Sequence, residues 1–258
     1  SVYPAPLLAI EPSYPEPVTV ALRFMPTPPP VAEVPPLVAL SFDTEIPHGE
    51  EARRTLTQVM STLREAGVHA TFFVVGSWAA ANPDVLRRLR ADGHEIANHS
   101  LTHRRFAARS ASELRRELDR VADLVLSETG APIAPLFRPP YGCIDEAAAQ
   151  LARRDGYQLA GWTAYGRDAS SLTHSAAEVV ATVTPNLHSG AVILLHTNHW
   201  ITAAALPALL RVIDKRHLQA VPVSELLQRD PTGAARLAQS SLRDCTLRTA
   251  HLTHRRNS

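Results

Sequence analysis

Lysine is almost absent from this chain of 258 residues, because Lys215 is the only one among the 26 basic residues. We interpret the excess of arginine as the codon bias of a GC-rich genome and assign it no chemical role. The formal net charge is only +1. A chain with so little net charge lacks the strong basic field that nucleic acid or an anionic membrane would attract. We therefore expect no nucleic-acid partner.

Cysteines, aromatic residues and long apolar runs are also scarce. Two cysteines, Cys143 and Cys245, are too few to define a disulfide scaffold, and their spacing leaves open whether they pair. An aromatic content of 5% argues against a long stacking platform. No stretch has the apolar length needed to cross a bilayer. The first residues lack a basic region followed by an apolar one, so we expect a mature or trimmed chain.

The rest of the composition is that of a globular protein, with 45% hydrophobic and 20% charged residues. Prolines gather at the start, where residues 1–36 hold 11 of the 21. This density excludes a regular helix or a central strand and predicts a proline-rich N-terminal arm. We expect one domain over 37–228 and a polar C-terminal tail over 229–258.

Within residues 37–228, short apolar runs alternate with amphipathic segments. Buried strands are expected at 38–42, 70–75, 95–97, 136–138, 158–162, 191–195 and 219–222. Helices are expected at 50–67, 83–91, 112–128, 145–154, 178–184, 203–215 and 224–228. Ser112 is the expected N-cap of the third helix. About seven successive strand–helix units predict an α/β domain whose parallel sheet closes into an irregular barrel.

Two histidines four residues apart, His99 and His103, are the first chemical signal. We expect them on one face of a helical turn, where both imidazoles can reach one metal ion. Two imidazoles leave a divalent ion in need of a carboxylate and water, which is the incomplete coordination that a hydrolytic site requires. A pair of this spacing on its own is usually incidental, so its surroundings decide its meaning.

Polar residues follow the predicted strands at equivalent positions. In a parallel α/β barrel, the loops after the strands converge on one face, where active sites lie. Each residue alone has an ordinary explanation, such as a turn cap, a surface ion pair or a core histidine. Five such coincidences favour one shared site. The positions are Asp43 and Glu45, His99 and His103, Arg138, Trp162 with Asp168, and His196.

These blocks, in this order, resemble the five motifs of the polysaccharide deacetylase family, the NodB homology domain of carbohydrate esterase family 4. They are Ser41–Glu45, His99–His103, Arg138–Gly142, Trp162 with Asp168, and Leu194–His196. The resemblance covers about residues 37–228 and implies the irregular (β/α)7-type barrel of that domain. It also implies a metal-dependent hydrolase that removes N-acetyl, or alternatively O-acetyl, groups from a carbohydrate. A secreted, periplasmic or cell-envelope location would follow.

The resemblance assigns catalytic roles to four residues. Asp43 would be the general base that takes a proton from water, and Arg138 would orient its carboxylate. His196 would be the general acid that protonates the leaving nitrogen, with Asp168 holding its tautomer. The implied cofactor is a divalent metal, zinc in the first place, with cobalt or manganese as alternatives.

Substrate contacts are implied for three further residues. Tyr141 would offer its backbone N–H to the oxyanion of the tetrahedral intermediate. Trp162 and Leu194 would form the wall of a small pocket for the acetyl methyl group, although Trp162 equally suits an ordinary core position.

The first motif departs from the family's common form, which has two consecutive aspartates. Thr44 stands at the second position, and its neutral hydroxyl is a poor ligand for a divalent ion. Glu45 follows one residue later, and residues i and i+2 of an extended segment point the same way. We therefore expect Glu45 to join His99 and His103 as the third protein ligand.

Two alternatives stay open at this stage. One keeps the site but acts on the C–N bond of a small amide or cyclic imide, as in distant relatives whose acids are at i and i+2. The other is a non-catalytic glycan-binding protein that has lost its metal, a reading motivated by Thr44.

Overall fold

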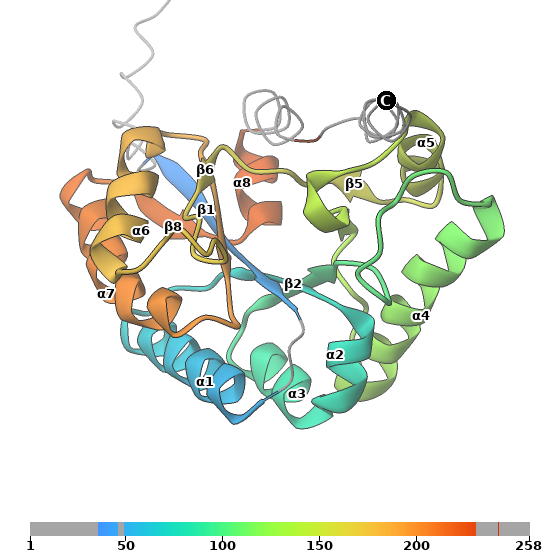
Figure 1. The fold of residues 1–258 in the computed structure, drawn as a ribbon, viewed down its shortest axis with the longest axis horizontal. Helices are drawn as coiled ribbons and strands as arrows, with labels where there is room; N and C mark the ends of the chain where they lie inside the picture. Colours follow the sequence, from blue (N-terminus) through green and yellow to red (C-terminus); the bar gives the residue numbers. More distant parts are fainter. Residues whose placement is uncertain (1–35, 46–48, 231–241, 243–258) are drawn as a thin grey trace, which may run out of the picture. The chain divides into compact units, whose positions relative to one another are not determined.

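The computed structural model describes residues 36–45, 49–230 and 242. These residues form one parallel sheet with helices around it (Figure 1). Its strands are β1 Leu37–Thr44, β2 Thr71–Val74, β3 Glu95–Asn98, β4 Leu136–Phe137, β5 Gln158–Leu159, β6 Ala164–Tyr165, β7 Val192–His196 and β8 Gln219–Val221. The expected proline-rich arm, apart from Pro36, and almost all of the expected tail lie outside the described residues.

Strand β1 lies at the centre of the sheet. It pairs with β7 on one side and, on the other, with β8 through its first residues and with β2 further along. The order is β5-β4-β3-β2-β1-β7-β6, and every pairing is parallel. No pairing joins β5 to β6 within the described residues, so the sheet is a half-barrel. The predicted parallel α/β fold of the irregular (β/α)7 type is confirmed, but the expected closure of the barrel is wrong.

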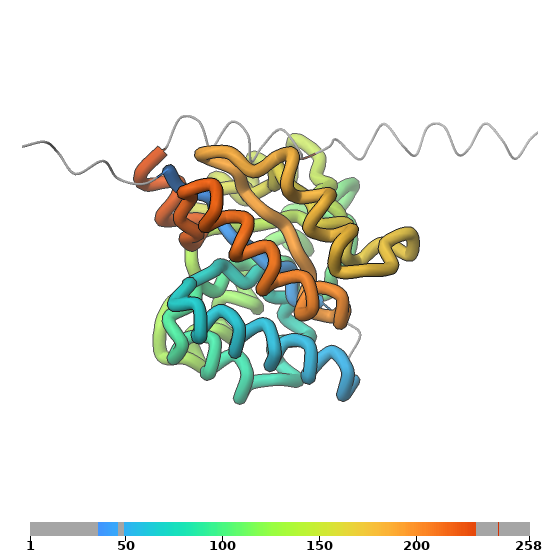
Figure 2. The backbone as a smooth tube through the Cα atoms, turned by 90° about the vertical axis from the view of Figure 1, so that its left-hand side faces the viewer, coloured from blue at the N-terminus to red at the C-terminus, as the bar shows by residue number. Residues whose placement is uncertain are grey.

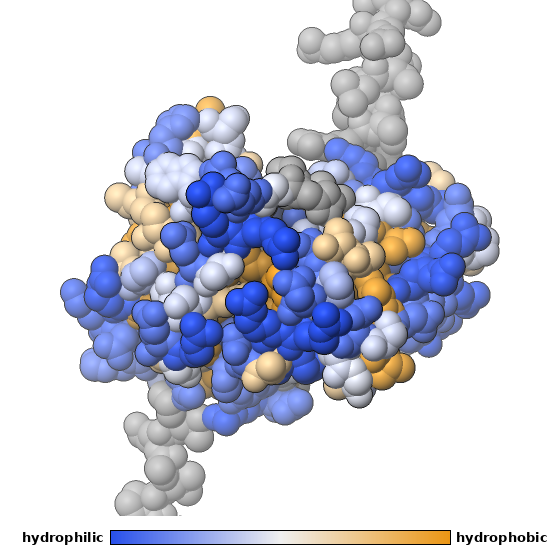
Figure 3. Space-filling model, turned by 90° about the horizontal axis from the view of Figure 1, so that it is seen from below, coloured by the Kyte–Doolittle hydropathy of each residue, from blue (hydrophilic) through white to orange (hydrophobic). Residues whose placement is uncertain are grey.

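Eight α-helices in the described residues surround the sheet. They are α1 Glu50–Glu65, α2 Gly76–Ala81, α3 Pro83–Ala91, α4 Ala111–Thr129, α5 Glu146–Arg154, α6 Ala176–Val183, α7 Trp200–Lys215 and α8 Val223–Arg229. Helices α1 and α7 lie side by side (Figure 2), as the pairing of β1 with β7 requires. The outward face seen from below Figure 1 is mostly hydrophilic (Figure 3). The helices therefore turn their apolar sides to the sheet.

Four predictions about the elements are wrong. The N-cap of α4 is Ser110, not Ser112, because only Ser110 has a glutamate three residues later to complete a capping box. Helix α2 was not expected, since its Gly-Ser start is typical of a loop. The strand expected at 158–162 ends at Leu159 as β5, and β6 is a separate short strand at Ala164–Tyr165. Helix α7 begins at Trp200 rather than at 203.

Two further features bear on the sequence predictions. Cys143 takes part in a disulfide, and Cys245, the other cysteine of the chain, lies outside the described residues. Among the described helices, none combines the length and the apolar character that a membrane crossing requires.

Candidate active site

The alternation of side chains along β1 and β7 directs the candidate residues into the half-barrel. Phe42 and Leu195 pack into the core beneath the helices, so their neighbours Asp43 and His196 face the opposite side of the sheet. Asp43 is the register partner of His196. Leu194 lies two residues before His196 and shares its face. The sheet itself therefore places the predicted base beside the predicted acid.

Glu45, the first residue after β1, joins this inward-facing group. One oxygen of its carboxylate, Oε1, lies 3.1 Å from Nε2 of His103, 3.7 Å from Nε2 of His99 and 3.8 Å from Nε2 of His196. Glu45, His99 and His103 form one set of ligand atoms close enough to hold a metal ion, and Asp43, Glu45 and His196 form another. Glu45 thus belongs to both sets.

Thr44 belongs to neither set. It is fully buried, and its hydroxyl has no hydrogen-bond partner within the described residues. The strand alternation turns it to the same side as Phe42, away from Asp43. Of the two candidates for the third ligand, only Glu45 reaches the histidines.

The expectation that His99 and His103 lie on a helical turn is wrong. Ser100 and His103 have positive φ angles of 69° and 54°, and no helix covers the segment. Side chains take the backbone N–H groups that a helix would use: the Asn98 carboxamide accepts from the N–H of Ser100, and the Ser100 hydroxyl accepts from the N–H of His103. Both imidazoles nevertheless converge on Glu45, as the prediction required.

The hydrogen bonding of His99 tests whether these residues fit a metal ion. Its Nδ1 lies 2.7 Å from the carbonyl oxygen of Arg138. A carbonyl can only accept, so Nδ1 carries a proton, and in the neutral imidazole Nε2 then presents a lone pair. This lone pair faces Asp43 Oδ2 at 3.3 Å, and the Nε2 atoms of His99 and His103 make no hydrogen bond in the described part of the chain. Lone pairs that face carboxylate oxygens need a cation between them, and two imidazoles with a carboxylate are a donor set for a divalent metal.

The charges of the cluster agree with this fit. Burial alone would lower the pKa of His99, but the carboxylates of Asp43 and Glu45 outweigh burial and raise it. Burial alone would raise the pKa of Glu45, but the imidazoles of His103 and His99 and the charge of His196 lower it. The Glu45 carboxylate therefore stays ionised and favours positive charge at the centre of the cluster, whether from a proton or from a metal ion.

Arg138 holds the other oxygen of the Asp43 carboxylate. Its Nη1 donates to Asp43 Oδ1 over 2.7 Å, and the side chain is fully buried. Nη2 donates to the Ser41 hydroxyl and to the carbonyl of Gly161, and Nε donates to the carbonyl of Ala160. With every one of these contacts made, the guanidinium has one position, and it fixes the orientation of Asp43.

Asp168 holds His196 in a similar way. One carboxylate oxygen lies 2.9 Å from Nδ1 of the imidazole, and the other accepts from the backbone N–H of His196 and from the hydroxyl of Thr202. Burial alone would lower the pKa of His196, but Asp168 and the more distant Asp43 and Glu45 raise it to about 9. The arrangement leaves Nε2 as the free end of a protonated imidazole.

Tyr141, Gly142 and Trp162 form one edge of the site. Tyr141 is 59% exposed, has a φ of 62°, and its ring lies 4.7 Å from that of His103. A Cβ atom on Gly142 would lie only 2.6 Å from the Trp162 ring. Trp162 therefore packs directly on the Gly142 backbone, beside the candidate ligands.

This contact gives a stability prediction. Gly142→Ala is expected to destabilise the fold by about 2–4 kcal/mol, since it combines a φ of +64° with a clash against Trp162. Gly130→Ala is the matched control, because Gly130 has a similar φ of +71° and nothing within 4 Å. The control should lose only about 1–2 kcal/mol. Equal losses in denaturant unfolding would contradict the close contact.

Three residues of the site were missed in the sequence. The Ser41 hydroxyl accepts a hydrogen bond from Arg138, and the Thr202 hydroxyl donates one to Asp168. A single serine or threonine in a sequence gives no sign of such a role. Tyr165 in β6 lies with its ring 6.0 Å from those of both Trp162 and His196. Its position beside the fourth motif was the available signal. Burial and the carboxylates of Asp168, Asp43 and Glu45 raise the pKa of Tyr165 to about 12, so its hydroxyl keeps its proton.

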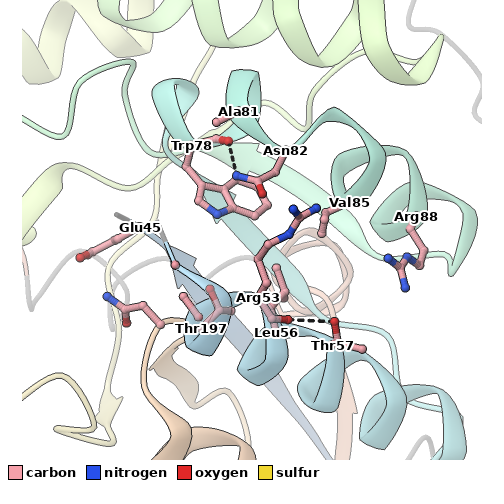
Figure 4. A pocket seen from close by; sticks show the side chains of 13 residues that line it. Glu45, Arg53, Leu56, Thr57, Trp78, Ala81, Asn82, Val85, Arg88 and Thr197 are labelled. Atoms are coloured by element: carbon pink, nitrogen blue, oxygen red, sulfur yellow. Dashed lines mark hydrogen bonds between the residues drawn. The ribbon is translucent and has the colours of Figure 1, made fainter. Parts of the chain in front are cut away.

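A separate pocket of about 300 Å³ lies on the other side of Glu45, along α1, α2 and α3. Figure 4 shows Trp78, Asn82 and Arg53 around it and the carboxylate of Glu45 pointing away from it. The Asn82 carboxamide donates to the Trp78 carbonyl over 2.9 Å and so fixes one wall. The carboxylate of Glu45 therefore serves the cluster inside the half-barrel and not this pocket.

Comparisons with known proteins show which family this chain resembles. Residues 32–160 match the family model for polysaccharide deacetylase. The peptidoglycan-N-acetylglucosamine deacetylase of Bacillus cereus is 32% identical over 195 residues, which cover 74% of this chain and 88% of that protein. The peptidoglycan-N-acetylglucosamine deacetylase PgdA of Listeria monocytogenes is 30% identical over 79% of this chain, which spans only 42% of its length.

Solved structures agree on the fold. A family 4 carbohydrate esterase from Streptomyces lividans, solved in complex with acetate, has a TM-score of 0.64 and 28% identity, covering 72% of this chain and 91% of its own. BA3943 of Bacillus anthracis, described as a pseudoenzyme of the same family, has a TM-score of 0.68 at 23% identity and covers 75% and 66%. This second likeness concerns the fold alone. From the matched residues, the half-barrel and these relatives, we conclude that the chain belongs to the polysaccharide deacetylase family, carbohydrate esterase family 4.

Proposed function

We propose that this protein is a metal-dependent hydrolase that removes acetyl groups, N-acetyl in the first place, from a carbohydrate of the cell envelope. The observation that carries the proposal is the convergence of His99, His103 and Glu45 beside Asp43 and His196. The names of the Bacillus and Listeria relatives support a peptidoglycan-type substrate and a secreted or envelope location. We assign the activity to a domain over residues 37–228.

The proposed ligands are His99, His103 and Glu45, which hold a divalent ion, with zinc favoured over cobalt or manganese. Such an ion supplies Lewis acidity and lowers the pKa of water. Asp43 takes the proton from the attacking water through Oδ2, since Oδ1 is engaged by Arg138. The ion pair with Arg138 keeps the Asp43 carboxylate oriented for that proton transfer.

His196 then protonates the nitrogen that leaves as the C–N bond breaks. Its Nε2 faces the cluster because Asp168 holds Nδ1. The backbone N–H of Tyr141 serves the oxyanion of the tetrahedral intermediate. Trp162 and Leu194 enclose the acetyl methyl group. Amide hydrolysis requires a base without its proton and an acid that carries one. Different partners hold the two groups here, because Arg138 holds Asp43 and Asp168 holds His196.

The direct test is acetate release by the metal-loaded protein from acetylated chito-oligomers, peptidoglycan and xylan. We expect a chelator to abolish the release and added zinc, cobalt or manganese to restore it. The reason is that His99, His103 and Glu45 are ligands and cannot themselves supply the Lewis acidity of the metal ion. Metal content is measured in the same samples. Release that continues in metal-free protein would contradict the proposal.

Two other outcomes of this test have defined meanings. Hydrolysis of ureides or cyclic imides, without acetate release from any glycan, would identify a C–N hydrolase for small amides. Glycan binding without bound metal or hydrolysis would identify a non-catalytic relative, which is the reading that Thr44 suggested.

The role of Asp168 gives a pH prediction. Asp168 raises the pKa of His196, and the proposed acid works only in its protonated form, so activity is lost as the pH rises through that pKa. Asp168→Asn is therefore expected to move the alkaline loss of kcat to lower pH and to reduce kcat about 10²–10⁴-fold. Asp119→Asn, at an exposed site on α4, is the control for the substitution itself. An unmoved alkaline limb would show that Asp168 does not act through His196.

A further inference from the structure

The two histidines of the proposed metal site are held in different ways. The His99 ring is fixed by the contact of its Nδ1 with the carbonyl oxygen of Arg138. No hydrogen bond of this kind reaches the His103 ring from any described residue; its Nε2 faces Glu45 Oε1 at 3.1 Å, and the ring lies against that of Tyr141. A ligating imidazole normally donates its second N–H to an outer group that fixes the ring. The place of His103 therefore depends on the backbone of its loop.

The backbone at His103 has a conformation that few residues other than glycine adopt. Its φ of 54° lies in the left-handed region, which persists where surrounding contacts impose it. On the N-terminal side, the first two N–H groups of α2 donate to the carbonyls of Ser100 and Leu101, each over 2.9 Å. These bonds fix the loop as far as Leu101. The residue between this fixed part and His103 is Thr102.

Helix α4 holds Thr102 through the side chain of Glu117. The carboxylate oxygen Oε2 accepts from the backbone N–H of Thr102 over 2.8 Å, and Oε1 accepts from the Thr102 hydroxyl over 2.7 Å. One carboxylate thus takes both of the polar hydrogens that Thr102 offers. The residue directly before His103 is thereby tied to a long helix.

Glu117 occupies a position where the pattern of the helix favours an apolar residue. It is the one charged member of the buried stripe of α4, whose other members are Leu114, Leu118, Val121 and Val125. Its burial, with only 8% exposed, is unfavourable for a carboxylate unless hydrogen bonds compensate. An apolar side chain would complete the stripe, so the packing of the helix gives no reason for a glutamate here. The bonds to Thr102 give that reason.

We propose that Glu117 is a positioning residue for the metal site, which fixes Thr102 and through it places the His103 imidazole as a ligand. The inference rests on the proposed function, whose ligand loop it concerns. Glu117 is not one of the clustered ligand groups, so it acts on the metal only through the loop backbone. A loop without this contact spends less time in the conformation that binds the ion, and the metal affinity falls by the same fraction.

Glu117→Leu tests this role. Leucine completes the apolar stripe and removes both bonds to Thr102, which is itself exposed and finds water instead. We expect the affinity for zinc, measured by competition with a chelating indicator dye, to fall about tenfold. This is the lower end of the range for residues that support a metal ligand, since one residue intervenes. The urea midpoint of the metal-free protein should not fall. Unchanged zinc affinity would overturn the role.

Two further variants separate position from charge. Glu117→Gln keeps both bonds, because its carboxamide oxygen accepts from the N–H of Thr102 and its NH₂ group donates to the hydroxyl. It should therefore bind zinc nearly as tightly as the wild type. Glu128→Leu removes another carboxylate of α4, which pairs with Arg87, and should also leave the zinc affinity unchanged. Equal losses in Glu117→Gln and Glu117→Leu would show an effect of charge and would contradict positioning.

The loop side offers a check that does not depend on how α4 tolerates a substitution. Thr102→Val removes the hydroxyl contact and keeps the backbone one, so its loss of zinc affinity should be smaller than that of Glu117→Leu. The combined variant should lose no more than Glu117→Leu alone, because the hydroxyl then has no partner on the helix. Additive losses would contradict the action of Glu117 through Thr102.

Zinc affinity is measured without substrate, so this inference and the proposed function fail separately. If Glu117→Leu weakens zinc binding but no acetylated carbohydrate is hydrolysed, the proposed function fails and the positioning role stands. If the wild type releases acetate and Glu117→Leu binds zinc as tightly as the wild type, the positioning role fails and the function stands.

Discussion

Asp43→Asn is expected to reduce kcat about 10²–10⁴-fold while the protein keeps its metal. The carboxylate oxygen that faces His99 is the only one of the pair that Arg138 leaves free, and it is the proposed acceptor of the proton from water. Asparagine has nearly the same shape but cannot take that proton. The measurement is the initial rate of acetate release at saturating substrate, with metal content determined on the same sample.

Two controls make this result specific. Asp123→Asn changes an exposed carboxylate on α4 and should leave kcat unaltered. Retained metal in Asp43→Asn separates a lost base from a lost ligand, because His99, His103 and Glu45 are all still present. A kcat of Asp43→Asn within a factor of a few of the wild-type kcat would contradict the assignment of Asp43 as the base.

Glu45→Gln is expected to weaken metal binding by at least about 100-fold and to abolish activity at ordinary metal concentrations. Loss of a residue that merely supports a ligand costs about 10–100-fold in affinity, so loss of a direct ligand should cost at least the larger figure. Glu45 Oε1 is the oxygen on which three imidazoles converge, and its charge balances the cation. Competition with a chelating indicator dye measures the affinity.

Thr44→Val is the matched control for Glu45→Gln. Its hydroxyl is buried without a hydrogen-bond partner within the described residues, so its removal should leave both metal affinity and activity unchanged. If the Thr44 variant lost metal and the Glu45 variant kept it, the ligand would be assigned to the wrong neighbour, and the inward direction of Glu45 would be contradicted.

Most of the sheet could be predicted from the sequence because its strands are buried on both faces. The run Ala191–Leu195 is apolar without interruption, and only Ser41 interrupts the run Val38–Phe42, which is typical of strands buried on both faces. The prediction failed where contacts distant in sequence decide the backbone. The 158–162 segment ends its strand early because the carbonyls of Ala160 and Gly161 bond to Arg138, a residue more than twenty positions away.

The identities of the site residues were more predictable than their local structure. The motifs bring Asp43, Glu45, His99 and His196 together because each lies at, or directly after, the C-terminal end of a parallel strand. The expected helical turn at His99–His103 failed, since a four-residue spacing does not reveal that Asn98 and Ser100 side chains would take the backbone donors. The catalytic roles of these residues stay predictions.

Arg138 gives the half-barrel an unusual dependence on one side chain. At the end of β5, beyond which no strand of the described residues continues the sheet, the Arg138 guanidinium binds the carbonyls of Ala160 and Gly161, and the same group holds Asp43. A relative that abandons hydrolysis would still need this arginine to keep the chain in place. An Arg-Pro-Pro block retained in a related sequence therefore indicates that the fold is kept. The residues at positions 43 and 45 indicate whether the hydrolytic activity is kept.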